Sequence, residues 1–206
     1  MKRVAAVSLI LCICVALMLK FWVVELPQVT GQDMAPTIMR GDRLWVYRLD
    51  RKPVRGALVL LEHPSGPQLL IRRVVGLPGE SVAVTRETPV VGGTPAQRAV
   101  VGDLELQDEG AGQAVHVKLR RVRETVGDTT YEVAKDPRRR SVDVKAVTLR
   151  GSYFVLADNR NHGTDSRTFG PVPEAKILGI VTRRVSAGAP SAPGEAPRAG
   201  CAPLSP

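Results

Sequence analysis

The sequence predicts an all-β protein preceded by one N-terminal transmembrane helix. Two observations predict the β class: short runs of strand-forming residues alternate with Gly, Pro and Asp turns, and no later window of about 15 residues shows a helical stripe. A third observation, the nearly uninterrupted apolar run Val4–Val24, predicts the helix. We therefore expect a β body behind a membrane anchor.

The apolar run is interrupted only by Ser8 and Lys20. As a helix, at about 1.5 Å per residue, it would be about 31 Å long, close to the roughly 30 Å hydrocarbon core of a bilayer. A cleavable secretory signal is the alternative, but no pair of small residues follows at a suitable distance. Lys2 and Arg3 precede the run, so the positive-inside rule places the N-terminus in the cytoplasm and the main domain on the exported side. Residues 1–26 are thus expected to anchor a single-pass protein in the cell membrane.

The β body is predicted from short runs rich in Val, Leu, Ile and aromatic residues. Strands are expected at residues 43–48, 57–62, 69–75, 81–85, 153–156 and 177–181. Between the third and fourth of these runs, Gly76-Leu-Pro-Gly79 is a typical turn sequence.

Composition divides the chain after the anchor into three further parts. Residues 27–85 and 150–185 are expected to form the core of the body. In residues 86–149 charge and glycine become more frequent while strand-like alternation persists, so we expect an inserted β-rich lobe. Residues 186–206 are dominated by Ala, Pro, Gly and Ser without periodicity, which predicts a disordered tail.

Charge and cysteine content restrict the partners. The chain has 29 Lys and Arg against 20 Asp and Glu, a net charge of +9. Because no known nucleic-acid-binding motif is evident, we expect membrane lipid as a partner and no nucleic acid. The cysteines, Cys12, Cys14 and Cys201, are odd in number and lack metal-ligand spacing. We therefore expect no disulfide framework, no metal and no cofactor.

Four short segments follow one another in a characteristic order. They are Gly31-Gln-Asp-Met-Ala-Pro-Thr-Ile38 with Gly41-Asp42 after it, Arg55-Gly-Ala-Leu-Val59, Arg72-Arg-Val-Val-Gly-Leu-Pro-Gly79, and Ala157-Asp-Asn-Arg-Asn-His-Gly-Thr-Asp-Ser-Arg167. Behind a single anchor, these segments resemble the signature boxes of the type I signal peptidases. That family removes signal peptides from exported proteins with a Ser nucleophile and a neutral Lys base. The resemblance implies the family's β-rich fold, an apolar face against the bilayer, and a groove for an extended peptide with small residues before the scissile bond.

The resemblance fails at the positions of the chemistry. Asp33 stands where the family has its nucleophilic Ser, and Arg72 stands where it has its Lys. Gly163 replaces a hydroxyl residue that, in the family, hydrogen-bonds the Lys. The residues implied to form the cleft are Gly31, Met34, Pro36 and Gly163. Matching residues of the last box, implied to be structural, are Asp158, Asn159, Arg160, Asp165, Ser166 and Arg167.

These substitutions remove the expected catalysis. A lysine can be neutral when buried, but an arginine stays protonated in proteins and offers no lone pair. A carboxylate attacking a peptide bond would have to form an anhydride and expel a poor amine leaving group. Asp33 and Arg72 are therefore expected to form a forked ion pair instead.

We interpret the chain as a non-catalytic homologue that keeps the signal-peptide-binding cleft. It is expected to bind signal peptides of exported proteins and to work beside an active signal peptidase or the export machinery. Two enzymatic alternatives stay open. One is a relocated active site in a working signal peptidase that uses Thr30, Thr37 or His162. The other is an aspartic-type site that pairs Asp33 with Asp42, Asp158 or Asp165. A membrane-tethered β domain that does not recognise signal peptides is the third alternative.

Overall fold

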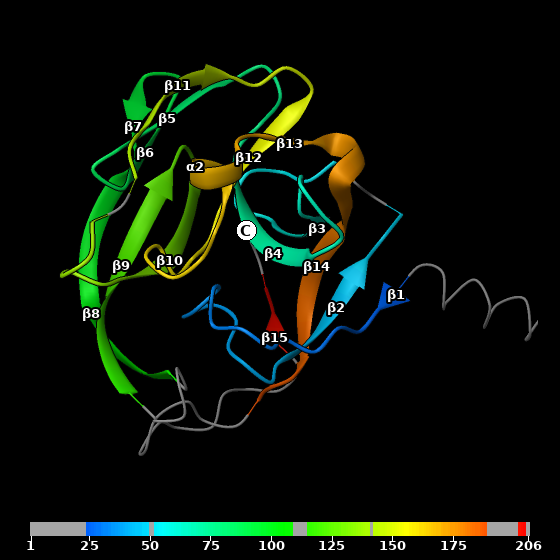
Figure 1. The fold of residues 1–206 in the computed structure, drawn as a ribbon, viewed down its shortest axis with the longest axis vertical. Coiled ribbons are helices and arrows are strands. Elements are labelled where there is room, and N and C mark those ends of the chain that lie inside the picture. Colours follow the sequence, from blue (N-terminus) through cyan, green and yellow to red (C-terminus); the bar gives the residue numbers. More distant parts are fainter. Residues whose placement is uncertain (1–23, 50–51, 109–114, 141, 189–201, 205–206) are drawn as a thin grey trace, which may run out of the picture.

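The computed structural model describes residues 24–49, 52–108, 115–140, 142–188 and 202–204. These residues form antiparallel β-structure in three sheets that surround a common interior (Figure 1). The all-β prediction is therefore confirmed for the described part of the chain. Most of the predicted anchor, Val4–Val24, lies outside it.

An eight-stranded sheet contains the strands predicted for the core except residues 81–85. Its order is β1 (Val24–Glu25), β2 (Arg43–Tyr47), β14 (Ile177–Ser186), β3 (Leu58–Glu62), β4 (Leu69–Gly76), β12 (Ser152–Leu156) and β13 (Val172–Pro173), with β15 (Ala202–Pro203) paired to β14. The expected strands appear within a residue or two of their predicted starts. β14 is longer than expected because it pairs with both β2 and β3.

Two smaller sheets contain the strands of residues 86–149. β8 (Gln97–Asp108), β9 (Val115–Val126) and β10 (Thr129–Lys135) form one sheet, and β5 (Ser81–Thr85), β6 (Thr88–Val91), β7 (Thr94–Pro95) and β11 (Val144–Thr148) form the other. Because β5 pairs with both β6 and β11, the predicted boundary at residue 86 runs through a sheet.

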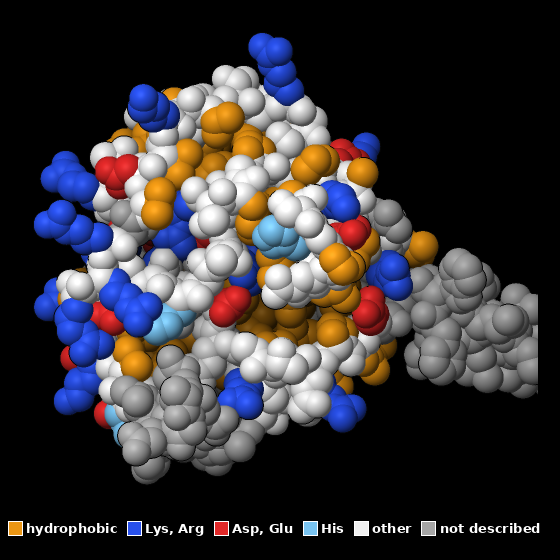
Figure 2. Space-filling view, in the orientation of Figure 1, with side chains coloured by type: hydrophobic (Ala, Val, Ile, Leu, Met, Phe, Trp, Pro, Cys, Tyr) orange, Lys and Arg blue, Asp and Glu red, His pale blue; other side chains and the backbone are white. Residues whose placement is uncertain are grey.

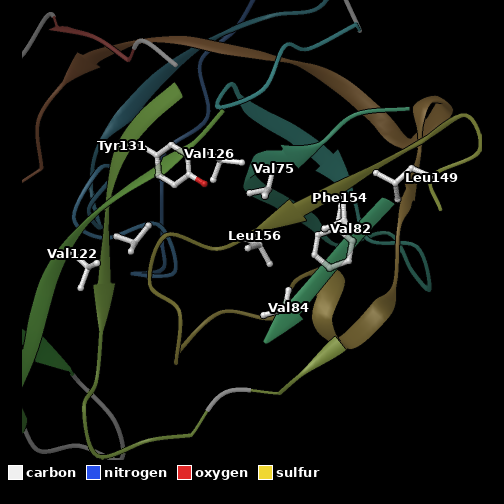
Figure 3. Packing of buried hydrophobic residues seen from close by; sticks show 10 residues of the cluster. Val75, Val82, Val84, Val122, Val126, Tyr131, Leu149, Phe154 and Leu156 are labelled. Atoms are coloured by element: carbon white, nitrogen blue, oxygen red, sulfur yellow. The ribbon is translucent and has the colours of Figure 1, made fainter. Parts of the chain in front are cut away.

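One hydrophobic cluster joins the lobe to the main sheet. Val122 and Val126 of β9 belong to the same buried cluster as Val75 of β4 and Phe154 of β12, and Figure 3 shows them around one interior. Full burial of each such side chain contributes about 1.5–3 kcal/mol. The lobe therefore shares its core with the rest of the body.

Helical structure is slight in the described residues. It consists of the four-residue α2 (Ser166–Phe169) and the 3₁₀ turn η2 (Glu174–Lys176). Among all residues that the structure describes, no helix has the length and apolar character needed to cross a bilayer.

The predicted ends of the chain differ from the structure in two places. Val24, expected at the end of the anchor, lies in β1 opposite Tyr47 of β2. In the tail that we predicted to be disordered, Ser186 still belongs to β14, and Ala202–Pro203 pairs with Arg183 and Arg184. The tail prediction is therefore wrong for these residues, since composition alone cannot reveal that a short segment pairs with an available strand.

Candidate functional site

Asp33 and Arg72 meet where a nucleophile and a base were expected. Arg72 lies in the middle of β4, opposite Val59 of β3, while Asp33 begins the turn that leads toward β2. Nη2 of Arg72 donates a hydrogen bond to Oδ2 of Asp33 at 2.8 Å. The arginine side chain is 2% exposed and the aspartate side chain 39%, so the carboxylate is the accessible half of the ion pair.

The predicted contact is present, but the predicted forked geometry is wrong. Arg72 uses its other nitrogens on backbone carbonyls: Nε donates to Thr164 at 2.7 Å and Nη1 to Ile71 at 2.6 Å. Each nitrogen of the guanidinium therefore has an oxygen partner, and the group is held as a cation. It provides no lone pair for general base catalysis.

The turn carrying Asp33 is fixed by the last box. The backbone N–H of Asn159 donates to the carbonyl of Asp33 at 2.8 Å, and the Asn159 side-chain amide donates to the carbonyl of Gln32 at 3.2 Å. Met34 follows at 3% exposure and anchors the turn in the hydrophobic core. Two sequence segments that lie far apart in the chain thus position one carboxylate.

Gly163 borders Asp33, and it has no room for a side chain. A Cβ atom at Gly163 would lie 2.5 Å from Cβ of Ala157 and 3.3 Å from Cβ of Asp33. The first distance is far below van der Waals contact, and Ala157 is fully buried. The methyl group of Ala157 therefore occupies space that a hydroxyl residue at position 163 would need.

Two hollows flank Asp33. The first, of about 380 Å³, lies between residues 27–34 and β4, and it has hydrophobic walls from Met34, Leu70 and Ile71. Figure 2 shows hydrophobic side chains gathered in a hollow near the middle of this face. Gly31 and Asp33 also line the second hollow, and Pro36, although described, lines neither. A bound chain that crosses from one hollow to the other would therefore pass the Asp33 carboxylate.

The second hollow, of about 230 Å³, is smaller and more polar. Thr30, Arg40 and His162 line it together with residues of the lobe. Nε2 of His162 is buried and has no hydrogen-bond partner. The described residues contain no group of three or more His, Cys, Asp or Glu side chains arranged to hold a metal ion.

A forked ion pair does form one residue further along β4. Nε and Nη2 of Arg73 donate to the two oxygens of Asp158 at 2.7 and 2.5 Å, and both side chains are buried. The Arg73 guanidinium also stacks 4.5 Å above the ring of Tyr131. Thr37 donates to Asp158 at 2.5 Å and accepts from Arg73 at 3.1 Å, so its hydroxyl is held in this network. Burial raises the pKa of the Tyr131 phenol well above its usual value.

Arg160 connects the last box to the lobe. Its Nη2 donates to Glu124 of β9 at 2.5 Å, and the Tyr131 hydroxyl donates to the same carboxylate oxygen at 3.0 Å. Arg160 and Glu124 are both buried, so each compensates the charge of the other.

Asp165 and Ser166, near the end of the last box, stabilise the loop that contains them. Asp165 accepts from the backbone N–H of Ala157 at 2.9 Å and from Nε of Arg167 at 2.8 Å, and it caps α2. Ser166 accepts from the backbone N–H of Val155 at 2.9 Å. Asp42, Asp158 and Asp165 are fully buried and each accepts hydrogen bonds from the surrounding fold. These contacts are structural and bring none of the three acids into the contact between Asp33 and Arg72.

The chain matches one known protein family over most of its length. Residues 1–186 match the family described as "Signal peptidase, peptidase S26", and the chain belongs to this family.

The particular relatives are bacterial signal peptidases I. The chain is 32% identical over 174 residues to signal peptidase I of Bacillus caldolyticus, which covers 84% of this chain and 85% of the relative. It is 31% identical over 195 residues to signal peptidase I of Pseudomonas aeruginosa, covering 82% of this chain but spanning only 64% of the relative's length. A solved signal peptidase I from Enterococcus faecalis aligns with a TM-score of 0.36 and 22% identity, over 64% of this chain and 97% of that one.

Proposed function

We propose that this protein is a membrane-anchored, non-catalytic member of the signal peptidase I family that binds the signal peptides of exported proteins. The observation that supports it most is the contact between Arg72 and Asp33 at the base and nucleophile positions. A protonated guanidinium cannot accept the proton that a nucleophile must release. The proposal requires no cofactor.

The loss of activity should be large. In a Ser-His-Asp protease, removing the catalytic residues together lowers turnover by about a million-fold, which corresponds to about 8 kcal/mol of barrier. Here nucleophile, base and supporting hydroxyl are all replaced, at Asp33, Arg72 and Gly163. We expect turnover no higher than the remaining turn and cleft can supply.

Peptide binding is supported by the first hollow. Its hydrophobic walls and the lack of a side chain at Gly31 suit an extended segment with small residues. The hollow follows β4 on one side, so main-chain hydrogen bonds and shallow pockets could both contribute to affinity. We propose that a signal peptide lies here with the bond that relatives would cleave beside Asp33.

We further propose that the apolar run before β1 anchors the protein in the cell membrane. The net charge of +9 favours contact with anionic lipid headgroups on the membrane surface. Lys and Arg side chains gather over β8 and β9 in Figure 2. In this position the protein would hold signal peptides in competition or cooperation with an active signal peptidase or the export machinery.

A binding titration tests the proposal. A labelled, uncleaved signal peptide that contains an Ala-x-Ala site is titrated with the full chain in lipid nanodiscs, and fluorescence anisotropy is measured. Saturable binding that is lost when Leu70 and Ile71 are replaced by Asp supports the cleft. Absence of binding by the folded chain would instead favour a β domain that does not recognise signal peptides.

A working signal peptidase with relocated groups is the second candidate function. Two observations favour it: His162 lines the same hollow as Thr30 and Asp33, and its buried Nε2 has no hydrogen-bond partner. If this histidine were a base, His162→Ala and Thr30→Val would each abolish a measurable preprotein cleavage. Under the main proposal there is no such cleavage to abolish.

A further inference from the structure

We infer that Asp33 makes the cleft selective for uncleaved signal peptides, by disfavouring any peptide that ends there in a free carboxylate. The inference rests on the proposed function, since it concerns what the same cleft accepts. It assigns Asp33 a specificity role in place of the lost catalytic one.

The accessible charge in this part of the cleft is negative. Of the described residues lining the first hollow, Asp33 and Arg72 are the charged ones. Arg72 is 2% exposed and directs its nitrogens to Asp33, Thr164 and Ile71. Asp33 is 39% exposed and borders both hollows. A ligand therefore meets the carboxylate first, with the guanidinium behind it.

The chemistry of peptide cleavage decides which ligand carries an opposing charge. A nucleophile must lie about 3–3.5 Å from the carbonyl carbon that it attacks, so position 33 marks the place of that carbon. In an uncleaved preprotein this carbon belongs to an uncharged amide. After hydrolysis by another enzyme, the same carbon of the signal peptide is a carboxylate.

The size of the discrimination follows from Coulomb's law. We place the peptide carboxylate about 3.5 Å from Asp33 and roughly 3 Å farther from the guanidinium, so repulsion exceeds attraction. The difference corresponds to about threefold in affinity at the dielectric constant of water and about 40-fold at an effective value of 20. Arg40 lines only the second hollow, so a cleaved end in the first hollow meets Asp33 before Arg40. The cleft would thus hold precursors and release spent signal peptides.

Two forms of one peptide test this inference. A labelled signal peptide that stops at the third residue of its Ala-x-Ala site is made as the C-terminal acid and as the C-terminal amide. Each is titrated with the full chain in nanodiscs of a zwitterionic lipid, and the ratio of the two Kd values is measured. We expect the acid to bind about 3- to 40-fold more weakly than the amide. In Asp33→Asn the ratio should fall toward one, whereas the matched control Asp128→Asn, on an exposed turn, should keep it.

The outcomes separate this inference from the proposed function. Equal Kd values, or tighter binding of the acid, would overturn the selectivity while leaving signal-peptide binding intact. If neither form binds, both proposals fail. If Asp33→Asn does not fold, the salt dependence of the unsubstituted chain tests the inference instead. The ratio of the acid and amide Kd values should shrink between about 0.1 M and 1 M salt, where the screening length falls from about 10 to 3 Å. A Kd ratio that does not change with salt concentration would contradict an electrostatic origin of the selectivity.

Discussion

The close approach of Gly163 and Ala157 predicts that these two positions can only be changed together. We consider Gly163→Ala, Ala157→Gly and the double exchange. A Cβ at position 163 would lie 2.5 Å from Cβ of Ala157, so the first substitution forces atoms of a fully buried region apart. The double exchange moves one methyl group from one side of the contact to the other.

The magnitudes follow from packing. Overpacking of a buried site costs about 1–3 kcal/mol, and we expect this cost for Gly163→Ala. Ala157→Gly loses a buried methyl group worth about 0.8 kcal/mol and adds about 0.5–1 kcal/mol of backbone entropy cost. In the double variant the clash is absent, so its cost should be smaller than the sum of the single costs by about 1–3 kcal/mol.

Urea unfolding of the four proteins, followed by tryptophan fluorescence, measures this coupling. Gly66→Ala is the matched control, because a Cβ there meets nothing within 4 Å, and its change in unfolding free energy should stay within about 0.5 kcal/mol. Strictly additive costs at positions 157 and 163 would refute the packing argument. They would also show that the methyl group of Ala157 does not keep a larger residue out of position 163.

Three further outcomes can be measured. Asp158→Ala leaves the buried Arg73 without its forked partner and should lower the free energy of unfolding in urea by about 3–5 kcal/mol. Arg48→Ala removes the exposed contact to Glu25 at 3.6 Å and should lower it by less than about 1 kcal/mol. Because burial raises the pKa of Tyr131, its contribution to stability is complete below about pH 10 and falls as the pH rises further, since only the unfolded phenol ionises. Unfolding at alkaline pH should therefore depend less on pH in Tyr131→Phe than in the unsubstituted chain.

The sequence predicted those features that depend on short segments and on the order of the boxes. The strands of the main sheet follow from apolar runs between turns, and the contact of Asp33 with Arg72 follows from the order of the boxes. The geometry of that contact did not follow. Nε and Nη1 of Arg72 donate hydrogen bonds to the backbone carbonyls of Thr164 and Ile71. Thr164 lies 92 residues away in sequence, so this contact depends on the fold.

Other features needed three-dimensional packing. Five residues separate Ala157 from Gly163 in the sequence, and no spacing rule shows that a Cβ at Gly163 would lie so close to that of Ala157. The strand at Ala202–Pro203 depends on pairing with β14, which a Pro-rich composition does not predict. The shared core of lobe and main sheet likewise depends on contacts between distant segments, such as β9 and β12.

The cation at position 72 leaves the site without a base. The most direct measurement is cleavage of a preprotein with an Ala-x-Ala site by an excess of the purified full chain, beside a variant carrying Asp33→Ser, Arg72→Lys, Gly163→Ser and Ala157→Gly. We expect no cleavage by the unsubstituted chain and measurable cleavage by the fourfold variant, in which Ala157→Gly makes room for a hydroxyl side chain at position 163. Specific cleavage by the unsubstituted chain at the Ala-x-Ala site, persisting through repeated purification, would contradict this expectation.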